Sequence, residues 1–159
     1  MFIYQDEIRK SLYRFKYQNH REYARFYAAA MTAGLGEWII AQRIDCIVPI
    51  PLHPKRQRLR GYNQAELLAR RLGERLALPV ETGMLLRVRQ TPPLKDLTRL
   101  QRMRNMEQAF AVKTEPFAGE RILLVDDIYT TGTTMDAAAS VLRSAGAGEI
   151  FAVSAAIGG

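Results

Sequence analysis

The stretch that decides the fold is ILLVDDIYTTGTT, residues 122–134. Its first four residues form a short apolar run of the kind that becomes a buried strand. The segment DDIYTTG is not expected to continue that strand. The next segment, TTMDAAASVLRSAG, has the composition of a helix that ends at Gly146, a typical C-terminal cap. The stretch therefore predicts a strand, a loop and a helix in direct succession.

The flanking segments place this unit in an α/β sheet. Short apolar runs at 44–50, 85–89 and 149–157 indicate further strands. The second half of the chain therefore alternates strand, helix and strand, which favours a mainly parallel central sheet flanked by helices. We expect two regions: an N-terminal helical hood over 1–43 and a core over 44–159.

The helices are expected from apolar spacing and from capping residues. Helical patterns cover 5–17, 20–42, 63–77 and 97–108, and Gly34 and Gly36 weaken the second. Asn63 is the expected N-cap of the third, with Glu66 as its partner three residues on. A basic loop punctuated by prolines is expected over 51–62.

The loop after the first strand is suited to hold a phosphate. Backbone N–H groups at the start of a helix point outward, and the helix dipole favours an anion there. Gly132 permits a close backbone approach or a positive φ. The hydroxyls of neighbouring threonines add donors, and the absent Gly-Lys-Ser/Thr ending excludes a Walker loop. The candidate phosphate-binding residues are Thr130, Thr131, Gly132, Thr133 and Thr134.

The acid pair Asp126 and Asp127 precedes this loop. Two carboxylates beside a phosphate need another partner, and ribose hydroxyls or waters on Mg²⁺ fit that requirement. A loop that binds a 5′-phosphate, beside carboxylates that accept hydrogen bonds from the 2′- and 3′-hydroxyls, indicates a ribose 5-phosphate. The alternative is a strand end whose solvated acids cap the following helix.

Residues 122–134 resemble the signature that binds phosphoribosyl pyrophosphate (PRPP) in type I phosphoribosyltransferases. The segments VPIPLHPKRQRLRGYNQAELLARRL and LLRVRQTPPLKDLTRLQRMRNMEQAFAV, in the same order, resemble the ComF family from about Lys16 onward. This resemblance implies a type I phosphoribosyltransferase fold with a pyrophosphate loop at Pro49–Arg56. It also implies a mobile basic loop at Gln90–Arg104. ComF-like proteins often carry an N-terminal four-cysteine zinc module that this chain lacks.

The resemblance implies roles for particular residues. Pyrophosphate would be bound by the loop residues Pro51, Leu52, His53, Lys55 and Arg56. The catalytic set would be Asp126, Asp127, Lys95, Arg102 and Arg104. Mg²⁺ would be held near the acids by PRPP and water, with no direct protein ligand. For the basic residues, the alternative is a solvated surface.

Three functions follow from this interpretation. The first is transfer of ribose 5-phosphate from PRPP to a nitrogen nucleophile. The second is the handling of single-stranded DNA, which the competence role of ComF proteins implies, with Tyr62 stacking on a base. The third is a regulatory sensor of PRPP or nucleotides. Residues that would either stack on an acceptor or pack between helices are Tyr13, Tyr17, Tyr23 and Phe26.

Composition narrows the class of protein. The net charge is +7, with 48% hydrophobic and 25% charged residues, which is typical of a globular protein that attracts anions. No apolar run approaches the roughly 18 residues of a membrane span. The single cysteine excludes an internal disulfide, and His20 and His53 form no recognisable metal site. We expect a cytoplasmic protein, and the sequence leaves a monomer and a homodimer both open.

Overall fold

A computed structural model describes residues 2–90, 106–114, 116 and 118–158. Its central sheet has four strands in the order β1-β6-β5-β2, and all neighbouring pairs are parallel. These strands are β1 (Phe2–Ile3), β2 (Cys46–Pro49), β5 (Ile122–Tyr129) and β6 (Ile150–Ile157). The α/β class and the mainly parallel sheet predicted from the sequence are therefore confirmed.

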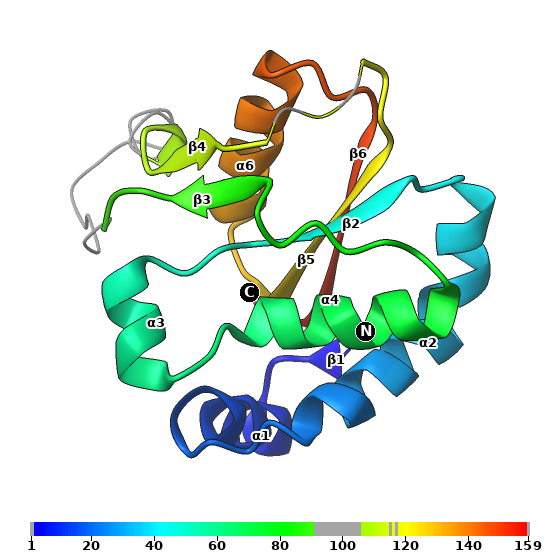
Figure 1. Ribbon diagram of the computed structural model, residues 1–159. Helices are drawn as coiled ribbons and strands as arrows, with labels where there is room; N and C mark the ends of the chain where they lie inside the picture. The colour runs from blue at the N-terminus through cyan, green and yellow to red at the C-terminus, as the bar shows by residue number, and fades with distance from the viewer. Residues whose placement is uncertain (1, 91–105, 115, 117, 159) are drawn as a thin grey trace.

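Helices cover both faces of this sheet (Figure 1). On one face lie α1 (Asp6–Tyr17), α2 (Tyr23–Ala41) and α4 (Gln64–Leu76), and on the other lies α6 (Thr133–Ser144). The short antiparallel pair of β3 (Leu85–Arg87) and β4 (Phe110–Val112) packs beside α6. Because β1 pairs with β6, residues before the expected boundary at 43 contribute to the same sheet as those after it.

The two faces of β5 belong to different cores. Leu123 and Val125 pack with α1, α2 and α4, whereas Ile122 and Leu124 pack with α6 and β3. Successive side chains of a strand point to opposite faces of the sheet. This alternation directs Asp127 toward α1 and Asp126 toward α6.

The sequence prediction that DDIYTTG would not continue the strand was wrong for DDIY, residues 126–129, and right for the three residues that follow. β5 extends to Tyr129 because the long strand β6 lies beside it, with Asp126 opposite Ser154 and Tyr129 opposite Ile157. The acid pair is therefore fixed within a strand ladder, and only the segment after Tyr129 forms the loop.

Two helical predictions also need correction. The basic segment expected as a loop contains a short helix, α3 (Pro54–Arg60), which begins with a proline at its first turn. Asn63 caps α4 as predicted, because its Oδ1 accepts the Ala65 N–H at 3.2 Å. Glu66 instead forms an ion pair with Arg70 at 2.8 Å.

The helix α2 continues through Gly34 and Gly36 without a break. Gly36 is buried against the side chains of Thr32 and Leu76, so close helix packing offsets the weak propensity of glycine. The helix expected at 97–108 lies mostly outside the described residues. Among the helices that the structure describes, none is long and apolar enough to cross a membrane.

Candidate functional site

The loop between β5 and α6 has the backbone geometry of an anion site. Gly132 is the N-cap of α6 and has a φ of 76°, in the left-handed region that favours glycine. Thr130 and Thr131 are exposed, and the hydroxyls of Thr131 and Thr133 lie 3.0 Å apart. The turn is therefore open to solvent, and its hydroxyls are gathered at one end of the helix.

The recess at this loop is small. It has a volume of about 20 Å³ and is lined by Asp126 and by residues 128–135. A Cβ built on Gly132 would lie 2.5 Å from the hydroxyl of Tyr129, which shows how closely that ring covers the glycine. Such a recess holds little more than one water, so a phosphate does not fit inside it with Tyr129 in this position.

Asp126 faces this recess. Burial, together with the neighbouring charge of Asp127, raises the pKa of the Asp126 carboxyl well above the usual aspartate range. Its Oδ1 accepts the backbone N–H of Asp127 at 2.8 Å. Carboxyls with a raised pKa in a cleft are typical of binding and catalytic sites.

Asp127 faces the opposite layer, where α1 supplies a cation. Its Oδ2 lies 3.0 Å from the Nζ of Lys16, and the two side chains are 10% and 21% exposed. The sequence analysis did not assign Lys16 to the site, because the residue lies far from the acid pair in the sequence. Only the fold shows that this side of α1 meets the end of β5.

The predicted pyrophosphate loop follows β2 and leads into α3. The His53 Nδ1 accepts the Lys55 N–H at 3.3 Å, so this side chain caps α3. The cationic side chains Lys55 and Arg56 of the first turn of α3 are exposed. These residues follow the carboxyl end of β2, which is the sheet edge where ligands bind in open α/β folds.

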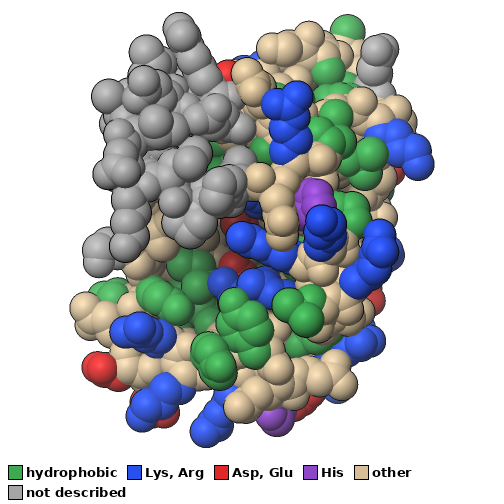
Figure 2. Space-filling view, turned by 90° about the vertical axis from the view of Figure 1, so that its left-hand side faces the viewer, with side chains coloured by type: hydrophobic (Ala, Val, Ile, Leu, Met, Phe, Trp, Pro, Cys, Tyr) green, Lys and Arg blue, Asp and Glu red, His purple; other side chains and the backbone are tan. Residues whose placement is uncertain are grey.

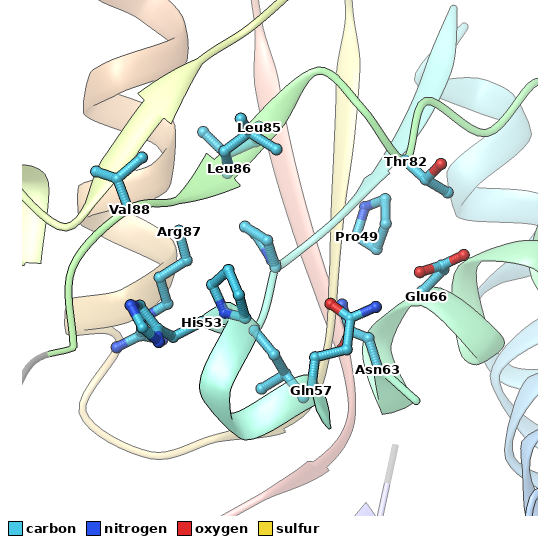
Figure 3. Close-up of a pocket in the computed structure, with 13 residues that line it drawn as sticks. Pro49, His53, Gln57, Asn63, Glu66, Thr82, Leu85, Leu86, Arg87 and Val88 are labelled. Atoms are coloured by element: carbon cyan, nitrogen blue, oxygen red, sulfur yellow. The ribbon is translucent and has the colours of Figure 1, made fainter. Parts of the chain in front are cut away.

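A cavity of about 370 Å³ lies between this loop, the start of α4 and β3 (Figure 3). Pro51, Leu52 and His53 of the predicted pyrophosphate set line it. Arg87 extends from β3 toward the start of α3, and its guanidinium lies over the Phe110 ring at 5.5 Å.

Arg87 is a second residue that sequence reasoning did not assign to the site. Burial and the charge of Arg56 lower the pKa of the Arg87 guanidinium, while Asp126 opposes that change. Arg87 therefore lies near enough to Arg56 of the predicted pyrophosphate loop and to Asp126 for both charges to act on its guanidinium. In the sequence, the signal that could have drawn attention to Arg87 was a cationic residue inside a predicted strand.

Figure 2 shows the side of the molecule that carries α3 and β3, where acidic side chains lie in a hollow surrounded by Lys and Arg. Among the described residues, no group of three His, Cys, Asp or Glu side chains is arranged to hold a metal ion. Three predicted catalytic residues, Lys95, Arg102 and Arg104, lie outside the described residues.

Tyr62 cannot stack on a nucleic-acid base as proposed from the sequence. It is 6% exposed, its hydroxyl donates to the carbonyl of Phe15, and the Arg21 guanidinium covers its ring at 4.8 Å. The residue belongs to the core between α1 and α4.

Comparison with known proteins gives the family. Residues 59–156 match the Phosphoribosyl transferase domain family. The chain belongs to this family. The match includes all of α4, β5 and α6 and the loop between β5 and α6, so the fold predicted from residues 122–134 is confirmed for this phosphoribosyl transferase domain.

Curated relatives carry competence and DNA-utilization names. Competence protein F of Haemophilus influenzae is 34% identical over 142 residues, which cover 86% of this chain and 62% of that protein. Competence protein ComFC of Bacillus subtilis is 30% identical over 146 residues, which cover 92% of this chain and 58% of that protein. DNA utilization protein YhgH of Escherichia coli is 34% identical over 106 residues, which cover 67% of this chain and 46% of that protein.

These names confirm the resemblance to the ComF family. The chain spans less than two thirds of the length of each of these relatives.

Proposed function

We propose that this domain binds PRPP with Mg²⁺ and transfers ribose 5-phosphate to a nitrogen nucleophile, releasing pyrophosphate. The observation that carries the proposal is the position of Asp126. It lines the recess of the phosphate loop and lies within electrostatic reach of Arg87, which lines the cavity at the pyrophosphate loop. Asp126 would thus lie between a site for the 5′-phosphate and a site for pyrophosphate, where its carboxyl could accept hydrogen bonds from the ribose hydroxyls.

Each part of PRPP has a matching group of residues. The 5′-phosphate would accept hydrogen bonds from backbone N–H groups at the start of α6 and from hydroxyls such as that of Thr131. The ribose hydroxyls would donate to Asp126 and Asp127. The pyrophosphate would lie by the cationic residues Lys55, Arg56 and Arg87, which reduce the repulsion among its charges.

Oxygen ligands of the kind that Mg²⁺ prefers are present, because Asp126 and Asp127 supply carboxylates at this edge of the sheet. A magnesium ion held there through water and through PRPP would supply positive charge to the departing pyrophosphate. The protein would bind and orient both substrates and exclude water around C1′.

In the proposed reaction, the nitrogen lone pair forms a bond to C1′ as the bond from C1′ to the pyrophosphate oxygen breaks. Pyrophosphate leaves with the electron pair, and the nitrogen releases a proton to solvent. Positive charge that develops on the ribose ring would be stabilised by the nearby carboxylates, and the negative charge of the leaving group by the cations of α3 and β3.

The proposal is tested by the melting temperature with and without PRPP and Mg²⁺. At a PRPP concentration about 100-fold above its dissociation constant, binding should raise the melting temperature by roughly 5–10 °C. The Asp126→Asn variant should lose this shift, and the Glu74→Gln variant, which changes an exposed acid on α4, should keep it. A shift of the same size in Asp126→Asn would contradict the role of the acid.

A second candidate function is the handling of single-stranded DNA. It is favoured by the net charge of +7 and by relatives named as competence and DNA-utilization proteins. Binding to a phosphate backbone should fall steeply with salt, because counterions are released. Retention of a single-stranded oligonucleotide at low salt, lost on replacing Arg102 and Arg104 by Gln, would support it. No retention at low salt would exclude it.

A further inference from the structure

The helix α2 has an apolar face that points away from the core. It lies beside α4 at the edge of the molecule (Figure 1), and of its 19 residues only Arg25 and Glu37 are charged. Its buried side chains, such as Tyr27, Met31 and Ile39, pack in the core with residues of α1 and α4. A helix that is apolar all round is normally buried on every side. An outward face of this kind on a surface helix indicates an interaction site.

Five residues form a seam along this outward face. They recur at intervals of four, three, four and three residues, which is the spacing of the contact positions in a coiled coil. The seam consists of Phe26, Ala30, Ala33, Glu37 and Ile40, none of which is fully buried. Phe26 and Ile40, at its two ends, are 58% and 65% exposed. The alanines between them leave room for another helix to approach closely, because the distance between packed helices depends on the side chains at the contact.

The aromatic side chain at the start of the seam is held in place. The Phe26 ring stacks on Phe2 of β1, with centroids 5.8 Å and planes 21° apart, and it meets Tyr27 edge-on at 5.4 Å. A side chain fixed in this way loses little conformational entropy when a partner binds to it. Well-packed aromatic side chains supply much of the binding energy at protein interfaces. Phe26 is therefore suited to anchor a bound helix.

A cationic groove of about 500 Å³ lies beside this end of the seam, between α2 and α4. Phe26 belongs to both, and the groove is also lined by Arg25 of α2 and by Arg71 and Arg75 of α4. Glu74 is the one acid in the lining, and it pairs with Arg71 at 2.8 Å. Within the described part of the chain, Arg25 and Arg75 are exposed and form no ion pair. The groove therefore offers two cations to the carboxylates of a partner.

Glu37 limits the kind of partner that fits this face. It lies about 18 Å from Arg25 along the axis of α2. A carboxylate within the seam disfavours a nucleic acid or an anionic lipid surface, because both present negative charge to it. One polar residue in such a seam commonly fixes how two helices align. The partner helix therefore needs acids near the groove and one cation near Glu37.

A second copy of this chain fits the face less well. It would bring one acid of its own α2, Glu37, to a groove in which Arg25 and Arg75 both lack a partner among the described residues. It would also bring its own net charge of +7, and two bodies of like charge repel each other. An acidic partner is attracted by the same charges.

We propose that the outward face of α2 binds an acidic amphipathic helix of another protein. The apolar side of the bound helix packs along the seam, and its carboxylates pair with Arg25 and Arg75. A cation of the partner lies by Glu37 and sets the alignment of the two helices. The groove shares no lining residue with the phosphate-loop recess or with the cavity at the pyrophosphate loop. The inference therefore goes beyond the transferase function and does not depend on it.

The test measures the binding of labelled helical peptides to the full chain by fluorescence anisotropy. Each peptide has about 18 residues, the length needed to cover α2, and carries a leucine seam, several glutamates at one end and one lysine near the other. Two such peptides are used, with the glutamates at the amino or at the carboxyl end. At least one should bind with a dissociation constant below about 100 μM and weaken several-fold as salt is raised. A peptide with lysines and glutamate exchanged should bind at least about tenfold more weakly.

Two variants identify the surface that the peptide contacts. Ala33→Gln places a longer polar side chain at the centre of the seam and should weaken binding by about tenfold. Arg75→Gln, in the last turn of α4, removes one cation of the groove and should weaken binding by about threefold. The matched changes Arg143→Gln and Ser144→Gln lie at exposed positions at the end of α6, on the other face of the sheet, and should leave the affinity unchanged. Thermal unfolding checks that each variant is folded.

Several results would overturn the proposal. These are no binding of either peptide at about 100 μM, equal binding of the charge-exchanged peptide, or equal losses in the α6 control variants. A dimer in sedimentation that Ala33→Gln converts to a monomer would mean that a second copy covers α2 instead. Binding of an oligothymidylate that Arg75→Gln abolishes, without binding of the peptides, would make the groove a nucleic-acid surface.

Discussion

Asp126 and Asp127 are adjacent in sequence but lie in different surroundings. Asp127 faces the layer of α1, α2 and α4, where the Nζ of Lys16 lies 3.0 Å from its Oδ2 and balances its charge. Asp126 faces the loop between β5 and α6, the candidate phosphate loop, and burial and the charge of Asp127 raise its pKa. One strand thus holds a carboxylate that is already paired with a lysine and a carboxyl that takes part in no ion pair among the described residues.

The largest expected effect tests the α1 side of this comparison. Lys16→Met leaves the mostly buried Asp127 charge without its partner, which should lower the free energy of unfolding by about 3 kcal/mol. Urea denaturation measures this change. Adding Asp127→Asn to the variant should restore most of the loss, because the buried charge is then removed.

Lys10→Met is the matched control, since Lys10 lies on the same helix and pairs with Glu7 in solvent. Its effect on the free energy of unfolding should stay below about 1 kcal/mol. If the two lysine variants unfold at the same urea concentration, the pair of Lys16 and Asp127 stabilises the fold no more than the exposed pair of Lys10 and Glu7, and the role given to Asp127 is wrong.

An intermediate effect tests the backbone of the phosphate loop. Gly132→Ala places a side chain at a φ of 76° and within 2.5 Å of the Tyr129 hydroxyl, so it should cost about 2 kcal/mol of stability. Gly146→Ala has a φ of 105° but open space around the new Cβ, and should cost about 1 kcal/mol.

Thermal unfolding of both glycine variants compares these costs. Combining Gly132→Ala with Tyr129→Ala should recover the part that comes from the contact between the two side chains. A full recovery would mean that the positive φ of Gly132 carries no strain of its own.

The smallest effect tests the phosphate-loop side of the comparison. Because the pKa of Asp126 is raised on folding, this group destabilises the folded state increasingly as the pH rises from about 4 toward its raised value. Asp126→Asn should therefore be more stable than the unmodified chain near neutral pH, by about 1 kcal/mol, and equal to it below pH 4. Unfolding curves from pH 4 to 8 measure the difference, and a less stable variant at pH 8 would contradict the raised pKa.

The local patterns of the sequence predicted most of the fold. The apolar run at 122–125 and the cap at Asn63 are decided by neighbouring residues, so periodicity and side-chain chemistry reveal them. The same holds for the ends of α6, where a glycine with positive φ precedes the helix and another follows it. The turn chemistry of Pro54 predicts the start of α3 too, although the segment was interpreted as a loop.

The parts that were missed depend on contacts between distant segments. The length of β5 is set by its pairing with β6, and the two-residue strand β1 exists only through Ala156 and Ile157. Lys16 and Arg87 reach the site from a helix and a strand far from it in sequence, so no local pattern reveals their partners. The sequence therefore indicated a candidate site along residues 126–134, but not the contribution of α1 and β3 to its surroundings.

The alternation of β5 also constrains how residues 122–134 can change in evolution. Replacing one aliphatic residue of the strand by another conserves which side chains face each layer. Deleting a single residue between Ile122 and Asp126 would shift the acids by one position, so that Asp126 would face α1 and Asp127 the phosphate loop. We therefore expect homologues to vary in composition here while conserving the spacing between the start of the strand and the first acid.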